Sequence, residues 1–306
     1  MTNQNTMHEK NLRQVSAGQR FMQVFVKIMV YAFLITMAII VVFPFYWMII
    51  SSLKDLDEYN RAVPTLFPEY IKWENYETAF TTAGLKRLFL NTVIVGVIST
   101  ILSLVITVLA AFAFARLEFK GKNALFAALL ATMMIPGELF TITNYITVHD
   151  FEWIYVPGTR DANIAGQFAA LIIPFLVSVF YIYLLRQNFL QIPNELYLAA
   201  KVDGTGDLKY LWKVMIPLSM PTLISITILK MMGAWNSYVW PRLVTTIPEM
   251  HLITNGLRDA FKDVNDKTDF PVQMAAVVIV SIPLFLVFLF LRKYIMRGVS
   301  RSGIKG

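Results

Sequence analysis

The stretch from Ile192 to Pro217 combines small, charged and turn-forming residues at helical spacing. Pro193 suits the first turn of a helix, and Glu195 places a negative charge at the positive end of that helix. The side chains expected to share one face are Leu196, Ala199, Ala200 and Asp203. This pattern predicts a helix of about ten residues whose small face lets another backbone approach closely.

A tight turn and a second helix are expected next. Gly204 follows Asp203 and is suited to the left-handed conformation that ends helices, so we expect a positive φ there. Asp207 is a good N-cap for a second helix through Trp212. We call residues 192–217 the knuckle. From local chemistry alone it is either a docking surface for a partner or a loop that joins two longer segments.

Other chemistry is sparse. The chain has no cysteine, which excludes disulfides and thiolate metal sites, and its histidines, His8, His149 and His251, lack metal-ligand spacing. The sequence contains no G-x-x-x-x-G-K-[ST] phosphate loop and no nucleophile–base or clustered acidic pattern. We therefore expect no catalytic residues, no metal and no cofactor bound by this chain.

Composition indicates a membrane protein. Of the 306 residues, 57% are hydrophobic and 15% are charged, against about 25% charged in soluble domains. A helix needs about 20 mostly apolar residues to cross a bilayer, because lipid offers no partner for backbone polar groups. We expect an all-α integral membrane protein with six transmembrane helices, near 24–50, 89–115, 123–147, 168–186, 214–234 and 274–292.

Charge asymmetry predicts the orientation, since Lys and Arg concentrate on the cytoplasmic side. The bases assigned to that side are Lys10, Arg13, Arg20, Arg116, Lys120, Lys122, Arg186, Lys201, Lys209, Lys213, Arg292, Lys293, Arg297, Arg301 and Lys305. The acids there are fewer, namely Glu9, Glu118, Glu195, Asp203 and Asp207. Both termini and the knuckle are therefore expected in the cytoplasm, and the basic balance reflects topology and not nucleic-acid binding.

The expected organisation has three parts. A polar cytoplasmic arm covers 1–23, a six-span domain covers 24–292, and a cytoplasmic tail covers 293–306. The arm is poor in apolar periodicity, so we expect residues Met1 to Arg20 to be dispensable.

The knuckle resembles the EAA loop of ABC importer permeases. That family pattern is E-A-A, three residues, G, nine residues, then I-x-L-P. Here the positions read Leu198-Ala199-Ala200, then Gly204, then residues 214–217 ending in Pro217. One departure is Leu198 at the Glu position, although Glu195 stands three residues earlier.

The resemblance extends over nearly the whole chain and is to the carbohydrate-uptake class, specifically the shorter membrane subunit of maltose-type importers. It rests on the stretches "NTVIVGVIST", "AAFAFARLEFKGKNALF", "MMIPGE", "LRQNFLQIPNEL", "GAWNSYVWP" and "GVSRSGIKG". The tail departs from the family by carrying Arg301 and Ser302 where small residues are usual.

This resemblance implies an assembly of several subunits. The partners expected are a second, homologous permease, two ATP-binding subunits and an extracellular solute-binding protein, in a bacterial or archaeal cell membrane. The knuckle would be a coupling helix that docks on an ATPase subunit, which binds the ATP. The tail residues expected to contact the ATPase subunits are Gly303, Ile304, Lys305 and Gly306.

The site of solute contact stays open between two interpretations. Trp235 and Asn236, with Tyr238 and Trp240, form either an aromatic belt at the membrane interface or part of the translocation path or binding-protein contact. Glu138 and Lys230 either extend to an interface or have a function within the membrane. The solute is a sugar, an oligosaccharide or a glycerol-phosphate-like molecule.

Two other classes of protein fit less well. An ion- or proton-coupled secondary carrier would carry acidic or histidine relays within its spans, and no such relay is seen. A membrane-embedded enzyme would need the clustered reactive residues that the spans lack.

Overall fold

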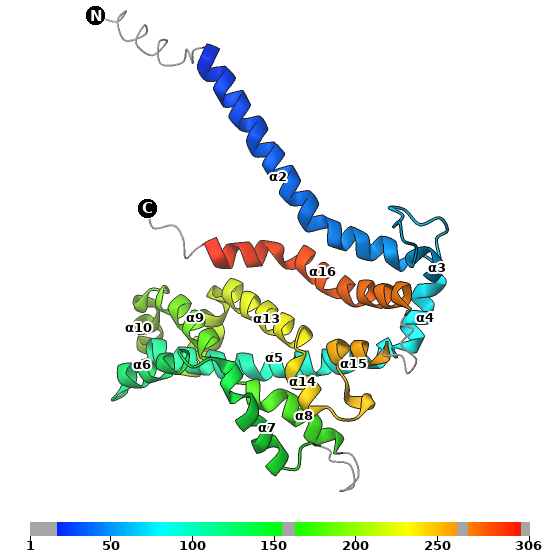
Figure 1. Cartoon of the computed structure of the whole chain (residues 1–306). Helices are drawn as coiled ribbons and strands as arrows, with labels where there is room; N and C mark the ends of the chain where they lie inside the picture. Colours follow the sequence, from blue (N-terminus) through cyan, green and yellow to red (C-terminus); the bar gives the residue numbers. More distant parts are fainter. Residues whose placement is uncertain (1–16, 155–162, 262–268, 301–306) are drawn as a thin grey trace, which may run out of the picture.

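The computed structural model describes residues 17–154, 163–261 and 269–300, and within these ranges every regular element is a helix (Figure 1). Three helices contain a stretch long and apolar enough to cross a membrane alone. They are α2 (Ala17–Ser52), α5 (Leu85–Arg116) and α16 (Phe270–Ser300). The all-helical fold class predicted from the sequence is confirmed for these ranges.

Three further candidate spans are pairs of helical segments bent at a short break. In the first pair, one segment is α6 (Lys122–Thr132), and the other is η1 (Gly137–Leu139) continued by α7 (Phe140–Asp150). These two segments meet at 78°. Helix α8 (Ile164–Ile172) with η2 (Ile173–Phe175) meets α9 (Val179–Leu190) at 51°. In the third pair, the first segment consists of α11 (Asp207–Tyr210), η3 (Leu211–Met215) and α12 (Ile216–Leu218). The second segment is α13 (Met220–Trp235), and the two meet at 81°. The fold thus offers three unbroken spans, or up to six if each bent pair is one span.

The bends have a chemical cause. Pro136 lies in the first break, Pro174 lies in η2 just before the second, and Pro217 and Pro221 flank the third. A proline inside a helix removes one backbone hydrogen bond and its ring clashes with the preceding turn. The expected spans at 123–147, 168–186 and 214–234 therefore each contain or adjoin a change of direction.

Helix α5 forms the centre of the body and packs against α9, α13, α15, α4 and α8. Its buried face carries small residues, among them Gly96, Ser99, Ser103 and Ala111. Small side chains let neighbouring helices approach closely, which is the usual way that helices associate within a membrane. The sequence of α5 thus supplies both the length of a span and a tight packing surface.

Helix α2 leaves the body over most of its length (Figure 1). Side chains from Phe21 to Phe45 are exposed, whereas Ser51 and Ser52 are buried and its C-terminal end packs against α16. Helix α2 begins at Ala17, before the expected start at residue 24, and α16 continues to Ser300, past the expected end at residue 292.

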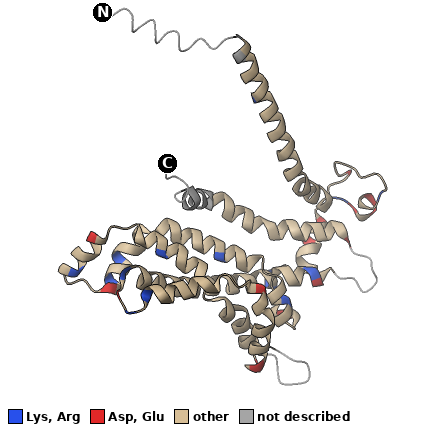
Figure 2. Cartoon of the chain, turned by 60° about the vertical axis from the view of Figure 1, so that its left-hand side comes forward, with Lys and Arg blue, Asp and Glu red and all other residues tan. Residues whose placement is uncertain are grey.

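Short helices occupy the two ends of the body (Figure 1). One end carries α10 (Asn194–Val202). The other end carries α3 (Leu56–Tyr59), α4 (Glu74–Thr82) and α15 (Ile253–Ala260), which follows α14 (Val239–Val244) and η4 (Pro248–Met250). Lys and Arg gather at the end with α10 (Figure 2).

Candidate functional site

The knuckle is a helical hairpin that stands on the end of the body. Helix α10 is followed by a turn at 203–206 and by α11, which continues into a single π-helical segment, η3. Pro193 is the N-cap and not the first helical residue, because its ψ of 135° is extended. Asp207 is the first residue of α11, and Gly206 takes the N-cap position expected for Asp207.

The turn at Gly204 has the geometry expected from its sequence. Gly204 has φ 68°, its amide donates to the carbonyl of Lys201 at 3.0 Å, and the amide of Thr205 donates to the carbonyl of Ala200 at 2.8 Å. These two bonds form a Schellman motif, in which a left-handed residue satisfies the last carbonyls of a helix. The positive φ predicted for Gly204 is confirmed.

One side of the knuckle is buried against the body. Tyr197, Tyr210 and Leu211 join a hydrophobic cluster with Phe112 of α5 and Phe189 of α9. The hydroxyl of Tyr197 hydrogen-bonds the Asp207 carboxylate at 2.8 Å, which ties α10 to α11. Burial, and then this hydrogen bond, raise the pKa of Tyr197. The knuckle is therefore packed onto the ends of α5 and α9.

The opposite side of the knuckle is exposed and partly apolar. Its exposed large hydrophobic side chains are Leu196, Leu198, Val202, Leu208 and Trp212. Ala199 is also exposed, as are Glu195, Asp203 and Gly204, but Ala200 is half-buried and packs against the inner cluster. Of the four side chains expected to share one face, Leu196, Ala199 and Asp203 are exposed, and Ala200 lies at the edge of that face next to the body.

Arg116 fastens the knuckle to the body. This last residue of α5 is buried, and its Nη2 donates to the carbonyls of Phe189 at 2.8 Å and Ile192 at 2.5 Å. Both carbonyls lie where α9 ends and the knuckle begins, where carbonyls lack the usual amide donor of the next helical turn, although the carbonyl of Phe189 also accepts from the amide of Ile192 at 3.3 Å. The sequence assigned Arg116 only to the cytoplasmic charge count, because its partners lie more than 70 residues away in the chain.

Trp235, Asn236 and Trp240, which the sequence singled out as possible solute contacts, have separate environments. Trp235 is buried in a cluster with Leu88 and Ile253, and its ring lies 5.7 Å from that of Phe89. Asn236 is exposed and donates to the carbonyl of Met232 within its own chain segment. Trp240 is buried too, with its indole nitrogen donating to the carbonyl of Ala170 at 2.9 Å. Trp235 and Trp240 are therefore both packed within the body.

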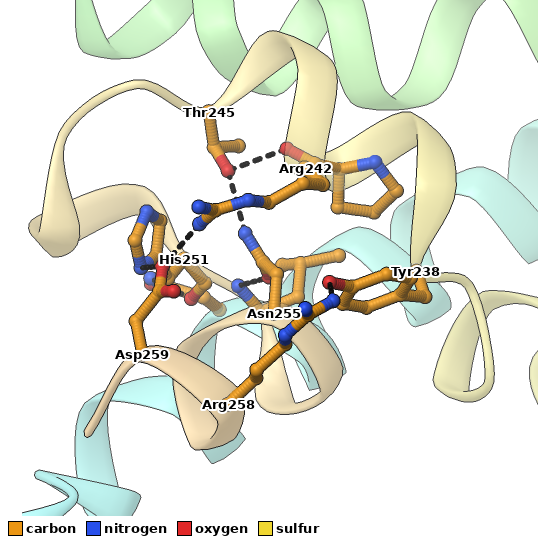
Figure 3. A network of polar contacts seen from close by, with 10 residues as sticks. Tyr238, Arg242, Thr245, His251, Asn255, Arg258 and Asp259 are labelled. Carbon is orange, nitrogen blue, oxygen red and sulfur yellow. Dashed lines mark hydrogen bonds and ion pairs between the residues drawn. The ribbon is translucent and has the colours of Figure 1, made fainter. Parts of the chain in front are cut away.

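A polar network joins α14 to α15 near these residues (Figure 3). Arg242 pairs with Asp259, and Asn255 donates to the hydroxyl of Thr245 at 2.9 Å. Tyr238 accepts a hydrogen bond from Arg258, and His251 lies 3.7 Å from Asp259. Burial is the main cause that lowers the pKa of His251. This network fixes the segment from α14 to α15, which we call the outer segment because it lies at the opposite end of α5 from the knuckle. The residue types alone did not indicate this network.

Glu138 and Lys230 differ in their surroundings. Glu138 is exposed in η1. Lys230 lines a cavity of about 390 Å³, and its Nζ donates to the carbonyl of Phe175 at 2.6 Å. Within the described parts of the chain, no group of three His, Asp or Glu side chains could hold a metal ion. The tail residues Gly303, Ile304, Lys305 and Gly306 and the arm residues 1–16 lie outside the described residues.

The helices and their apolar lengths define a multi-pass helical membrane protein with a partly exposed helical hairpin at one end. The model of the family described as "Binding-protein-dependent transport system inner membrane component" matches residues 103–301. The chain belongs to this family of ABC transporter permeases.

Curated relatives match along most of their length. The chain is 29% identical over 272 residues to the diacetylchitobiose uptake system permease protein NgcG of Streptomyces coelicolor, covering 89% of this chain and 87% of that one. It is 26% identical to the arabinooligosaccharides transport system permease protein AraQ of Bacillus subtilis, covering 90% and 94%. It is 27% identical to the sn-glycerol-3-phosphate transport system permease protein UgpE of Yersinia pestis, covering 93% and 98%.

A solved structure supports the fold. A chain of a bacterial ABC transporter involved in the import of the acidic polysaccharide alginate superposes with a TM-score of 0.77. The superposition covers 92% of this chain and 98% of that one at 23% identity. At this identity the likeness concerns the fold alone.

Proposed function

We propose that this chain is the membrane-spanning permease subunit of an ATP-driven, binding-protein-dependent importer for a sugar or oligosaccharide. The observation that carries the proposal is the knuckle, whose outer side exposes Leu198, Val202 and Trp212 while its inner side is locked to the body. The names of two relatives, for diacetylchitobiose and arabinooligosaccharides, support a sugar as cargo. A glycerol-phosphate-like solute is the second candidate, supported by the name of a third relative.

The proposed partners are a second permease, two ATP-binding subunits and an extracellular solute-binding protein. The knuckle would dock on an ATPase subunit through its exposed residues Glu195, Leu196, Leu198, Ala199, Asp203, Gly204 and Pro217, with the half-buried Ala200 at the inner edge of the contact. The tail from Gly303 to Gly306 would make a second contact with the ATPase subunits. Both termini would lie in the cytoplasm, and ATP would be bound by the partners and not by this chain.

The proposed mechanism is mechanical. When two ATPase subunits close on nucleotide, the surfaces that hold the knuckles move, and a knuckle locked to its body carries that movement into the spans. Tyr197 and Arg116 provide the lock, because both join the knuckle to α5 or α9 through buried contacts. The spans then alternate between inward- and outward-facing arrangements.

Uptake by the purified, reconstituted complex tests this proposal. We expect uptake of a sugar only with ATP inside the compartment that faces the knuckle and with the binding protein on the other side. Uptake driven by a proton or sodium gradient without ATP would instead identify a secondary carrier. ATP hydrolysis by this chain purified alone would contradict the assignment of the ATPase to partner subunits.

A further inference from the structure

The cavity that contains Lys230 has the size and lining of a small-molecule site. It measures about 390 Å³ and lies between α5, α9, α13, α14 and the η2–α9 break, within the range of about 300–1,000 Å³ typical of ligand pockets. Four separate parts of the chain contribute polar side chains to it, namely Ser99, Ser178, Tyr181, Lys230 and Ser237. Distant segments thus bring hydroxyl groups and one ammonium group to a single space.

Trp240 gives the cavity a fixed aromatic wall. Its indole nitrogen is already bonded to the carbonyl of Ala170, and its ring meets Phe175 edge-on at 5.4 Å and 80°. The ring is therefore held in one orientation where it lines the cavity. A rigid aromatic surface beside several hydroxyl groups suits a ligand with an apolar face and a polar rim, as a sugar ring has.

Lys230 is the unusual member of the lining. It lies in α13, whose composition is otherwise that of a membrane span, and charged residues in such positions are costly unless they face a partner or a water-filled space. One of its three possible hydrogen bonds goes to the carbonyl of Phe175 at 2.6 Å. Within residues 17–154, 163–261 and 269–300, no carboxylate forms an ion pair with it.

Within the part of the chain that the structure describes, the positive charge in this cavity is therefore matched by a backbone dipole and by no carboxylate. An ammonium group with remaining donors, placed among hydroxyl groups, is a complementary partner for an anionic group. A neutral sugar could bind to the hydroxyl groups and the aromatic wall alone. Its binding would then not offset the free energy that is needed to place a lysine in this cavity.

We propose that the cavity lined by Ser99, Ser178, Tyr181, Lys230, Ser237 and Trp240 binds the transported solute, and that Lys230 contacts an acidic group on it. The solute class is then a sugar or polyol that carries a carboxylate or a phosphate. This inference rests on the proposed function as a permease, and it narrows the cargo that the proposed function leaves open.

Variants of Lys230 separate a ligand contact from a purely structural one. Lys230→Gln retains an N–H donor for the carbonyl of Phe175 but removes the charge, whereas Lys230→Arg retains the charge. If Lys230 only satisfies that carbonyl, the Gln variant should transport as well as the wild type. If Lys230 contacts an acidic group, the KM of the Gln variant should be raised roughly tenfold, which is the loss of affinity expected for one charge-assisted hydrogen bond. The KM of Lys230→Arg should lie between those of the wild type and the Gln variant.

The test uses the full importer with its own binding protein in proteoliposomes, supplied with ATP and one of four labelled probes. Two probes are anionic, glycerol 3-phosphate and digalacturonate, and two are neutral, diacetylchitobiose and arabinobiose. We expect uptake of an anionic probe and a raised KM for it in Lys230→Gln, with unchanged membrane abundance and subunit co-purification. The response to the two anionic probes distinguishes a phosphate from a carboxylate.

Three outcomes contradict these claims, and they are distinguishable. Transport of neutral probes only would overturn the acidic cargo while leaving the permease function intact. Transport of an anionic probe by Lys230→Gln with wild-type KM would overturn the role of Lys230. Absence of ATP-driven uptake of every probe by an assembled wild-type complex would count against the proposed sugar importer itself, and the cargo inference would fall with it.

Discussion

Gly204 occupies a backbone conformation that other residues adopt only with strain. Its φ is 68°, and a Cβ built there would meet no atom within 4 Å. A substitution therefore acts through the backbone and not through a clash, and a β-branched residue costs about 1–2 kcal/mol in the left-handed region. For Gly204→Val we expect normal membrane abundance with loss of either solute uptake or co-purification of the ATPase subunit.

Gly206 supplies a matched control for that prediction. It lies in the same turn, it also has open space around its Cα, and its φ of −69° is open to any residue. Gly206→Val should therefore retain uptake. Full uptake by Gly204→Val, or equal loss in both variants, would show that the left-handed turn is not a pivot of the knuckle.

Neighbouring alanines on α10 allow docking to be separated from internal packing. Ala199 is exposed, whereas Ala200 packs against the body. Ala199→Trp should leave the chain stable but abolish co-purification of the ATPase subunit. Ala200→Trp overpacks the inner cluster at a cost of about 1–3 kcal/mol, so it should lower thermal stability in detergent as well.

Ala62→Trp is the control for the two alanine variants, since Ala62 is exposed in the loop after α3, at the other end of the body. It should retain co-purification of the ATPase subunit. Retention of the ATPase by Ala199→Trp would contradict docking through the exposed side of α10.

Residue chemistry in the sequence predicted only part of the knuckle. Glycine after aspartate at a helix end indicates a left-handed turn by itself, and Gly204 has that conformation. Ala200 packs against a cluster that includes Phe112 and Phe189, which are far away in the chain, so no local pattern could give its burial. The same reason hides the lysine cavity, whose lining comes from several separate segments.

Among elements, the apolar stretches were predicted and their directions were not. Hydropathy measures how much apolar sequence is present, and it is unaffected by a bend between two short helices. The signal that was available is proline: Pro136, Pro174 and Pro217 each lie at or beside a break. The angles of 78°, 51° and 81° depend on how neighbouring helices pack.

The outer segment from α14 to α15 should lose stability in acid. Burial lowers the pKa of His251, while Asp259 opposes this effect and Arg242 and Arg87 reinforce it. Below the unfolded pKa of about 6.5, the unfolded chain takes up a proton that the folded chain resists, so stability is complete above that pH and falls below it. The melting temperature of the purified protein should therefore fall between pH 7.5 and 5.5.

The fall should be smaller in His251→Gln, which has no imidazole to protonate. It should be unchanged in His149→Gln, which alters an exposed histidine. An equal fall in wild type and His251→Gln would show that other groups govern the acid response.

Across the whole molecule, α5 connects the two ends of the body. Near its start, the amide of Asn91 donates to the carbonyls of Glu249 at 2.8 Å and His251 at 3.1 Å, and Thr92 accepts from the amide of Ile253 at 2.9 Å. At its end, Arg116 holds the carbonyls of Phe189 and Ile192. A single straight helix is thus bonded to the outer segment at one end and to the knuckle at the other.

This arrangement makes Arg116 a positioning residue for transmission along the chain. Arg116→Met keeps much of the apolar stem but removes the charged donor to the carbonyls of Phe189 and Ile192, of which the first still accepts from the amide of Ile192, and losing a hydrogen bond to a charged group costs about 1.5–3 kcal/mol. The exposed side of the knuckle is unchanged, so the ATPase subunit should still co-purify and hydrolyse ATP, while uptake per ATP hydrolysed falls. Lys120→Met, which removes an exposed positive charge at the same end, should keep the wild-type ratio of uptake to hydrolysis.

Measuring ATP hydrolysis and solute uptake on the same proteoliposomes gives that ratio directly. A wild-type ratio in Arg116→Met would show that the knuckle drives the spans through its apolar contacts alone. Loss of the ATPase subunit would instead assign Arg116 to docking and not to transmission.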